Sequence, residues 1–345
     1  MLRLKTIDVS FRTAYAQAKE LALAQASVPL ITAGSIHVEP RGAARFAYRY
    51  RYGASGKRIA EYLGPEGSEE TALRIEEARQ EIAEHAVLGG YAQSLRRLGL
   101  YSADNSTIAT VATLFNVGIF GGGAVLVGTH AFGALLNELG ILSSPFPSTD
   151  DIDVVRARRI EVAAFPKGGM LALLRQTGLP FNEVPALGRR APATSYKVRG
   201  STLSVDLLVP SDTHPFAPVA VPELGAHATG LPFLRYLIEG PSFSMLIGRE
   251  RLVPVMIPHA GRFCIHKLAV HSLRGGGEEA KRDKDVLQAA MLAAALTEGS
   301  EWLLTEAIEA ITRPLRRRLS PGARRAVARL TPSHPAAAAA LEPLA

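Results

Sequence analysis

The sequence has a single cysteine, Cys264, among its 345 residues. A disulfide framework within the chain is therefore excluded. Because Cys264 lies in an apolar run, we expect a buried thiol in a protein of the reducing cytosol. One cysteine and scattered histidines also offer no spacing that is typical of a zinc site.

Two kinds of catalytic motif are absent as well. The sequence has no GxxxxGK[ST] phosphate-binding loop, because the glycines at 121–123 are not followed by the required lysine. It has no GxSxG elbow, so no hydrolase nucleophile is visible. Neither P-loop nor serine-hydrolase chemistry is indicated.

Long apolar segments are also missing. No charged residue lies between Asp104 and Glu138, but this stretch contains Asn116, His130 and six glycines. A membrane-spanning helix needs about 20 predominantly apolar residues. The N-terminal MLRLKTIDVSFRTAY has no apolar core of a secretory signal. We therefore expect a cytoplasmic protein with no membrane contact.

One stretch carries most of the chemistry: VLVGTHAFGALLNELGILSSPFPSTDDIDVV, from Val125 to Val155. It predicts a strand, a tight Gly128-Thr129 turn, a short helix, a loop and a second strand. That second strand contains Asp151 and Asp153, which lie two residues apart and would share one face, roughly 7 Å apart. The residues between and after them, Ile152 and Val154, would enter the core.

Two carboxylates on one face repel each other by about 4 kcal/mol at 4 Å and an effective dielectric of 20. Such a pair needs a cation, a shared proton or abundant water, and Mg²⁺ prefers one or two carboxylates plus substrate phosphates. A third acid, Asp206, lies in the strand-like run TLSVDLLVP. Beside the Asp151 strand, it would complete a two-metal site for in-line phosphoryl transfer.

These features resemble the DNA polymerase β-type nucleotidyltransferase superfamily. The resemblance spans roughly Val125 to Leu292. It is closer to bacterial nucleotidyltransferases with a GTHAF turn and more distant to toxin-type nucleotidyltransferases of abortive-infection systems. The turn has Thr129 rather than Ser, which keeps the hydroxyl, and 21 residues separate it from Asp151.

The resemblance implies an enzyme that transfers a nucleoside monophosphate from a nucleoside triphosphate, with two Mg²⁺ or Mn²⁺ ions. Asp151, Asp153 and Asp206 would be the catalytic metal ligands. The implied nucleotide-binding residues are Gly128, Thr129, His130, Lys267, Lys284 and Asp285. Alternatives remain for two of them, because His130 could simply pack in the core and Lys267 could be an ordinary surface lysine.

The chain length indicates more than one domain. We expect an α+β protein with a polymerase β-like catalytic domain on a small mixed sheet, a small N-terminal β-hairpin unit and a helical C-terminal domain. The expected boundaries are 1–66 for the N-terminal unit, 67–104 for connecting helices, 105–215 for the catalytic domain and 216–345 for the C-terminal domain. The connecting segment predicts one long helix, or two that break near residue 89.

Two basic regions are candidates for nucleic-acid contact in a chain of net charge +7. In ARFAYRYRYGASGKRIAEYLG the aromatic residues alternate with Ala and Arg, which predicts a hairpin with one aromatic and one basic face. The tail has seven arginines and no acid between Glu309 and Glu342, and its alanine run is expected to fray. The contact candidates are Arg49, Arg51, Lys57, Arg316, Arg317, Arg324 and Arg325. In both regions a solvated charged surface is the alternative.

Three functions follow from these observations. The first is a metal-dependent nucleotidyltransferase that acts on RNA such as tRNA; the resemblance to toxin-type enzymes adds a toxin role with an antitoxin partner as an expectation. The second is the same enzyme with a protein or small-molecule acceptor. The third is a catalytically silent module that binds nucleic acid, which three mutually repelling carboxylates argue against.

Overall fold

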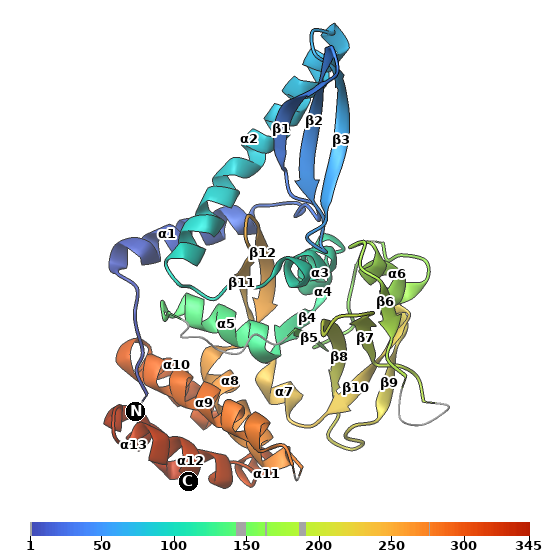
Figure 1. The fold of residues 1–345 in the computed structure, drawn as a ribbon. Helices are drawn as coiled ribbons and strands as arrows, with labels where there is room; N and C mark the ends of the chain where they lie inside the picture. The colour runs from blue at the N-terminus through green and yellow to red at the C-terminus, as the bar shows by residue number, and fades with distance from the viewer. Residues whose placement is uncertain (1, 143–149, 163, 186–190, 276) are drawn as a thin grey trace.

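The computed structural model describes residues 2–142, 150–162, 164–185, 191–275 and 277–345 (Figure 1). The strands are β1 (Ser35–Arg41), β2 (Ala44–Tyr52), β3 (Arg58–Pro65), β4 (Ala124–Val127), β5 (Asp151–Arg156), β6 (Phe181–Glu183), β7 (Ser195–Val198), β8 (Ser204–Pro210), β9 (Pro218–Val221), β10 (Ala226–Leu231), β11 (Ser242–Ile247) and β12 (Leu252–Ile257). The helices are α1 (Val9–Leu23), α2 (Glu69–Arg97), α3 (Asn105–Asn116), α4 (Ile119–Gly122), α5 (Gly128–Glu138), α6 (Gly169–Arg175), α7 (Leu234–Leu237), α8 (Ala260–Leu273), α9 (Glu279–Gly299), α10 (Glu301–Glu309), α11 (Arg313–Arg316), α12 (Ser320–Leu330) and α13 (Pro335–Leu341). None of the helices in these ranges is long and apolar enough to cross a bilayer.

A mixed sheet forms the centre of the molecule and confirms the predicted α+β class. Its strands follow the order β4-β5-β8-β10-β9. β5 runs parallel to β8 and antiparallel to β4. The other edge of β8 is shared, with β7 antiparallel along its first half and β10 parallel along its second half. β8 is therefore paired on both sides, as its run of β-branched and aliphatic residues predicted.

The two acid-bearing strands bury one face and leave the other for chemistry. Ile152 and Val154 of β5 are buried, as are Val205 and Leu207 of β8. Because side chains alternate along a strand, the aspartates between these residues point to the opposite face. The predicted alternation is confirmed for β5, and β8 alternates in the same way.

The C-terminal part is helical and packs below the sheet in Figure 1. α8 and α9 lie against each other, and α12 packs on both. The single cysteine lies inside this packing, where the Cys264 Sγ donates to the carbonyl of Ala289 at 3.3 Å. The expectation that the alanine run frays was wrong, because it forms α13, whose Ala337, Ala338 and Leu341 are buried.

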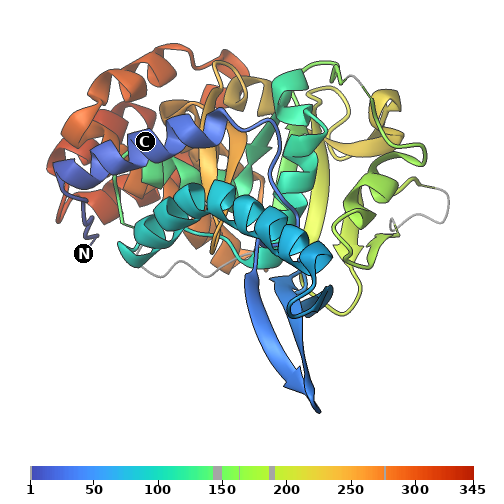
Figure 2. The same cartoon turned by 90° about the horizontal axis from the view of Figure 1, so that it is seen from above.

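One long helix joins the body to an N-terminal arm. α2 is continuous from Glu69 to Arg97, which confirms the first of the two predicted alternatives, one long helix without a break near residue 89. Its C-terminal half packs with α1 and the β11–β12 hairpin through Ala92 and Leu95. Its N-terminal half carries the antiparallel sheet β1-β2-β3, which stands out from the body in Figures 1 and 2.

The predicted domain boundaries stay a prediction, but three observations bear on them. α1 packs on the body, against β11 and β12, although it precedes the arm in sequence. β9 and β10 follow residue 215 and still belong to the central sheet. The β11–β12 hairpin lies beside β4 and α5. The body therefore draws on chain segments from both sides of the arm.

Asp104 offers a test of how α3 is held. Its Oδ1 accepts hydrogen bonds from the backbone N–H groups of Ser106 at 2.8 Å and Thr107 at 3.0 Å, which is an N-cap. Burial raises the pKa of Asp104, but the hydrogen bonds from Ser106 and Thr107 outweigh it and hold the pKa below the usual 3.8. The folded state therefore favours the carboxylate.

We expect Asp104→Ala to lower the free energy of unfolding by about 1 kcal/mol at pH 7. A depressed folded pKa stabilises the protein above the unfolded value, so the difference should shrink as pH falls through and below 3.8. Urea unfolding of both proteins across this pH range measures it. Asp104→Asn keeps an N-cap oxygen and serves as the control; an unchanged Ala variant would contradict the capping role.

Candidate active site

The Gly128-Thr129 turn and the three aspartates come together at one end of the central sheet. β4 ends at Val127, and the chain turns directly into α5 at Gly128. Val127 pairs with Asp153 of β5, and Asp153 lies opposite Asp206 of β8. Neighbouring strands are 4.7–4.9 Å apart, so Asp153 and Asp206 share a face at close range.

The turn touches the central aspartate directly. Gly128 has φ +69°, a conformation that glycine adopts readily. A Cβ at this position would lie 2.0 Å from Oδ2 of Asp153. Any other residue would therefore push the carboxylate away from the start of α5, and glycine is required here by both backbone angle and space.

Burial and neighbouring charge disfavour the ionised form of two of the three acids. Burial, then the charge of Asp206, raises the pKa of Asp153 to about 7, and Lys267 opposes this rise. Burial also raises the pKa of Asp206, against a hydrogen bond from Ser195. Asp151 is exposed and accepts a 2.8 Å hydrogen bond from Ser204 Oγ. A cation bound here would lower the cost of ionising Asp153 and Asp206.

The donor set fits a hard divalent cation. Carboxylate oxygens are the preferred ligands of Mg²⁺, which takes one or two of them and leaves the other positions for water and substrate phosphates. Among the residues that the structure describes, no three His, Cys, Asp or Glu side chains are placed to hold one ion by themselves. A site completed by a phosphate-bearing substrate is consistent with both facts.

A cavity of about 410 Å³ opens beside the central aspartate. Its polar wall includes Gly128, Asp153 and Lys267. Its apolar wall is formed by Leu208, Phe216, Leu231, Pro232, Leu234, Leu237 and Phe263. A cavity with an apolar wall and a few convergent polar groups is typical of a small-molecule site, and its volume suits a nucleotide.

The two predicted lysines approach from the C-terminal helices. Lys267 of α8 is mostly buried and pairs with Asp285 of α9, with Nζ and Oδ1 3.0 Å apart. Arg274 reaches the other oxygen of Asp285, also at 3.0 Å. Lys284 is half-buried. Burial lowers its pKa, and the charges of Asp151 and Asp153 oppose this shift. Lys267 is thus fixed in place rather than being a free surface lysine.

His130 lies on the buried side of α5 and not at an open surface. Its side chain is buried, and Nδ1 lies 2.8 Å from the Tyr101 hydroxyl. Burial lowers the pKa of His130 to about 4, so the ring is neutral at pH 7. Tyr101 in turn packs on Gly133, where a Cβ would lie 2.1 Å from the ring. The packing alternative for His130 therefore describes its surroundings best.

Several partners of these residues escaped the sequence reasoning: Tyr101, Ser195, Ser204 and Arg274. Each contacts a site residue across a large sequence separation or a loop, and no motif marks it. Arg274 alone had a signal, since it directly follows the helix that carries Lys267.

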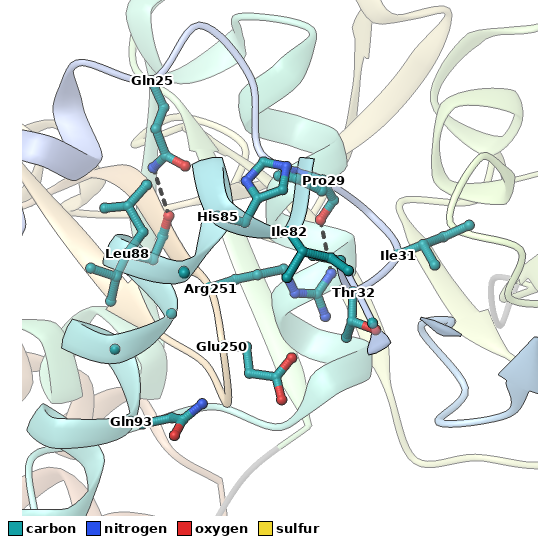
Figure 3. Close-up of a pocket in the computed structure, with 16 residues that line it drawn as sticks. Gln25, Pro29, Ile31, Thr32, Ile82, His85, Leu88, Gln93, Glu250 and Arg251 are labelled. Atoms are coloured by element: carbon teal, nitrogen blue, oxygen red, sulfur yellow. Dashed lines mark hydrogen bonds between the residues drawn. The ribbon is translucent and has the colours of Figure 1, made fainter. Parts of the chain in front are cut away.

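A second cavity, of about 330 Å³, lies where α2, the segment before β1 and the β11–β12 turn meet (Figure 3). Arg251 is buried beneath it and donates to the carbonyls of Pro29 and Leu30 at 3.0 and 2.9 Å. Gln25 similarly donates to the Leu252 carbonyl at 3.0 Å. These bonds fasten the N-terminal segment to the body, and no predicted site residue lines this cavity.

The predicted nucleic-acid contacts fall into two groups. Arg49 is buried between the arm and α2, where it pairs with Glu81 at 2.7 Å, so its charge is not offered to a ligand. Arg51 is half-buried, and Lys57 is exposed in the β2–β3 turn. In the tail Arg316, Arg317 and Arg324 are exposed, and Arg325 pairs with Glu279 at 2.7 Å.

The Lys267–Asp285–Arg274 cluster generates a stability prediction. Removing the charge of buried Asp285 leaves Lys267 without its partner and leaves Arg274 with Glu278 alone, and breaking a buried pair costs about 3–5 kcal/mol. We expect Asp285→Asn to lower the free energy of unfolding by about 3 kcal/mol in urea titrations. Asp283→Asn, an exposed position on the same helix, is the matched control and should cost less than about 1 kcal/mol. Equal effects would show that the buried cluster has no special role.

Comparison with known proteins adds the family. No curated protein matches the chain. A solved structure, an antigenic nucleotidyltransferase-like protein from Paracoccidioides brasiliensis, aligns over 75% of this chain and 91% of its own, at 16% identity and a TM-score of 0.29. The profile of a family described as Nucleotidyltransferase matches residues 105–312, well over half of the sequence, including the Gly128 turn, all three aspartates and both lysines. The chain belongs to this nucleotidyltransferase family.

Proposed function

We propose that the protein is a metal-dependent nucleotidyltransferase of the DNA polymerase β type, which moves a nucleoside monophosphate from a nucleoside triphosphate to a hydroxyl of RNA. The observation that carries the proposal is the pairing of Asp153 with Asp206 on adjacent strands. The cavity that Gly128, Asp153 and Lys267 line lies beside this pair. Acids, a helix N-terminus and a cation thus converge where a triphosphate would lie.

Each residue has a role in this proposal. Asp151 and Asp153 would hold the metal that binds the triphosphate, and Asp206 would join Asp153 at the metal beside the acceptor hydroxyl. The backbone N–H groups of Gly128 and Thr129 would receive phosphate oxygens. Lys267 would contact the triphosphate, and Asp285 would hold Lys267 in place. Two bound Mg²⁺ or Mn²⁺ ions would neutralise phosphate charge and make the acceptor hydroxyl more acidic.

The charge balance of the site supports metal dependence. Four acids surround it, Asp151, Asp153, Asp206 and Asp285, against three cations, Lys267, Arg274 and Lys284. At full ionisation these side chains are net negative before Glu278, which also lines the cavity, is included. A triphosphate is itself strongly anionic, so the protein's own cations do not suffice to bind it. Divalent cations would reverse this balance and bring the phosphates to the aspartates.

RNA as acceptor is supported by the distribution of positive charge. Exposed arginines follow the C-terminal helices, and phosphate contacts of this kind supply most nucleic-acid affinity. A toxin role with an antitoxin partner stays a prediction from the resemblance. Transfer to a protein or a small molecule would leave these arginines dispensable.

We expect Asp153→Asn and Asp206→Asn each to reduce transfer by about 10³-fold, because each removes a ligand of the metal ions that would neutralise the charge of the reacting phosphates. The assay is label transfer from each of four α-³²P nucleoside triphosphates to total RNA and total protein with Mg²⁺. Glu183→Gln, at an exposed acid of the same sheet, is the control. Transfer that persists in both Asn variants would contradict the assignment, and label on protein alone would change the acceptor.

A second prediction concerns the turn. Gly128→Ala and Gly200→Ala both place a Cβ at positive φ, which costs about 1–2 kcal/mol of strain in each case. At Gly200 nothing lies within 4 Å, whereas at Gly128 the Asp153 carboxylate must move. Both variants should therefore lose similar unfolding free energy, but only Gly128→Ala should lose transfer. Full activity of Gly128→Ala would mean that the carboxylate position is not critical.

A further inference from the structure

The arm presents an aromatic surface whose orientation is opposite to that of an ordinary amphipathic sheet. Arg49 points toward α2, where its side chain pairs with Glu81. Because residues alternate along β2, Tyr48 and Tyr50 point to the face away from α2. We define the aromatic face of the arm by its rings, His37, Phe46, Tyr48, Tyr50, Tyr52 and Tyr62.

Five of these rings form a continuous row across the three strands. Ring centroids are 5.6 Å apart for His37 and Tyr50, 6.2 Å for Tyr50 and Tyr48, and 5.5 Å for Tyr48 and Tyr62. Phe46 extends the row, at 6.0 Å from Tyr62. Tyr52 and Tyr62 are 46% and 50% exposed. A row of rings at a protein surface is unusual unless a ligand covers it.

Positive charge accompanies the rings. Ser35–Pro65 contains six Arg and Lys residues and two acids. The Arg58 guanidinium lies 4.5 Å from the Tyr50 ring centre, and that of Arg41 lies 5.0 Å from Tyr48. The flat surface thus combines aromatic faces with guanidinium groups. Aromatic rings receive unpaired bases, and arginines receive the phosphates or stack with the bases.

We propose that the aromatic face of the arm binds single-stranded nucleic acid by stacking unpaired bases on Tyr62, Tyr52 and their neighbours. A duplex fits this surface poorly, since its base faces are hidden within the helix. The role of the face in delivering the acceptor strand rests on the proposed function, whereas the binding itself needs neither nucleotide nor metal. The arm is fastened at its base, where Asn105 Nδ2 donates to the Gly53 carbonyl at 2.8 Å. A nucleic-acid strand bound to the aromatic face would therefore be attached to the catalytic body through the arm.

The test is fluorescence anisotropy of a short, unstructured, fluorescein-labelled oligoadenylate with the full chain, without nucleotide or metal. Tyr62→Leu keeps an apolar side chain but removes the ring, and we expect roughly tenfold weaker binding, in line with the measured worth of one stacked base. Tyr62→Phe keeps the ring and should bind like the parent. Trp302→Leu, at an exposed aromatic on α10, is the matched control and should have no effect.

Two further measurements make the outcome decisive. The same oligonucleotide as a duplex should bind at least tenfold more weakly, and ultraviolet cross-linking should attach the single strand to peptides of β2 and β3. Equal binding by Tyr62→Leu and the parent would overturn the proposal. So would a dimer, seen by light scattering, that Tyr62→Leu dissociates while RNA binding is unchanged, because the face would then join two copies. Binding that survives in Asp153→Asn separates this proposal from the catalytic one.

Discussion

The carboxylates on β5 and β8 repel one another, and the arrangement of the body depends on how this repulsion is contained. Parallel pairing puts Asp153 beside Asp206, and one face of both strands is fixed in the core by Ile152 and Val205. Neither aspartate can turn away without exposing those apolar residues. The strands therefore hold the acids together at a free-energy cost that a bound cation would offset.

The helices around the acids also offset the repulsion between the carboxylates. α5 begins directly against Asp153, and its N-terminus offers backbone N–H groups and a partial positive charge. Lys267 and Lys284 belong to α8 and α9, and Asp285 fixes Lys267 at the cavity. Asp285 holds Lys267 in position through their ion pair. Its own negative charge makes the site more negative and increases the need for cations. This combination suits the proposed binding of a metal ion together with an anionic substrate.

Much of this arrangement was predictable from sequence, because it rests on local patterns. Alternation in DIDVV predicted which residues face the core, the aliphatic run around Asp206 predicted a mostly buried strand, and Gly128-Thr129 predicted a turn into a helix; the structure confirms these predictions. The partners of the site were not predictable in the same way. Tyr101 reaches His130, and Ser204 reaches Asp151, through contacts that depend on how distant segments pack. Residue periodicity carries no information about such contacts, and a single sequence offers no other signal for them.

The orientation of the arm could not be predicted from the sequence pattern, for a physical reason. Period-two alternation in β2 predicts two faces of different chemistry, but it does not say which face is covered. Aromatic residues would ordinarily be buried, yet α2 covers the other face, where Glu81 pairs with Arg49 and where Ala47 is buried. The pattern of β2 does not include α2, so it could not show that the Arg49 face would be the covered one. Leaving the rings of the aromatic face partly exposed costs hydrophobic free energy in the isolated chain. The proposed stacking ligand would cover those rings and recover part of that free energy.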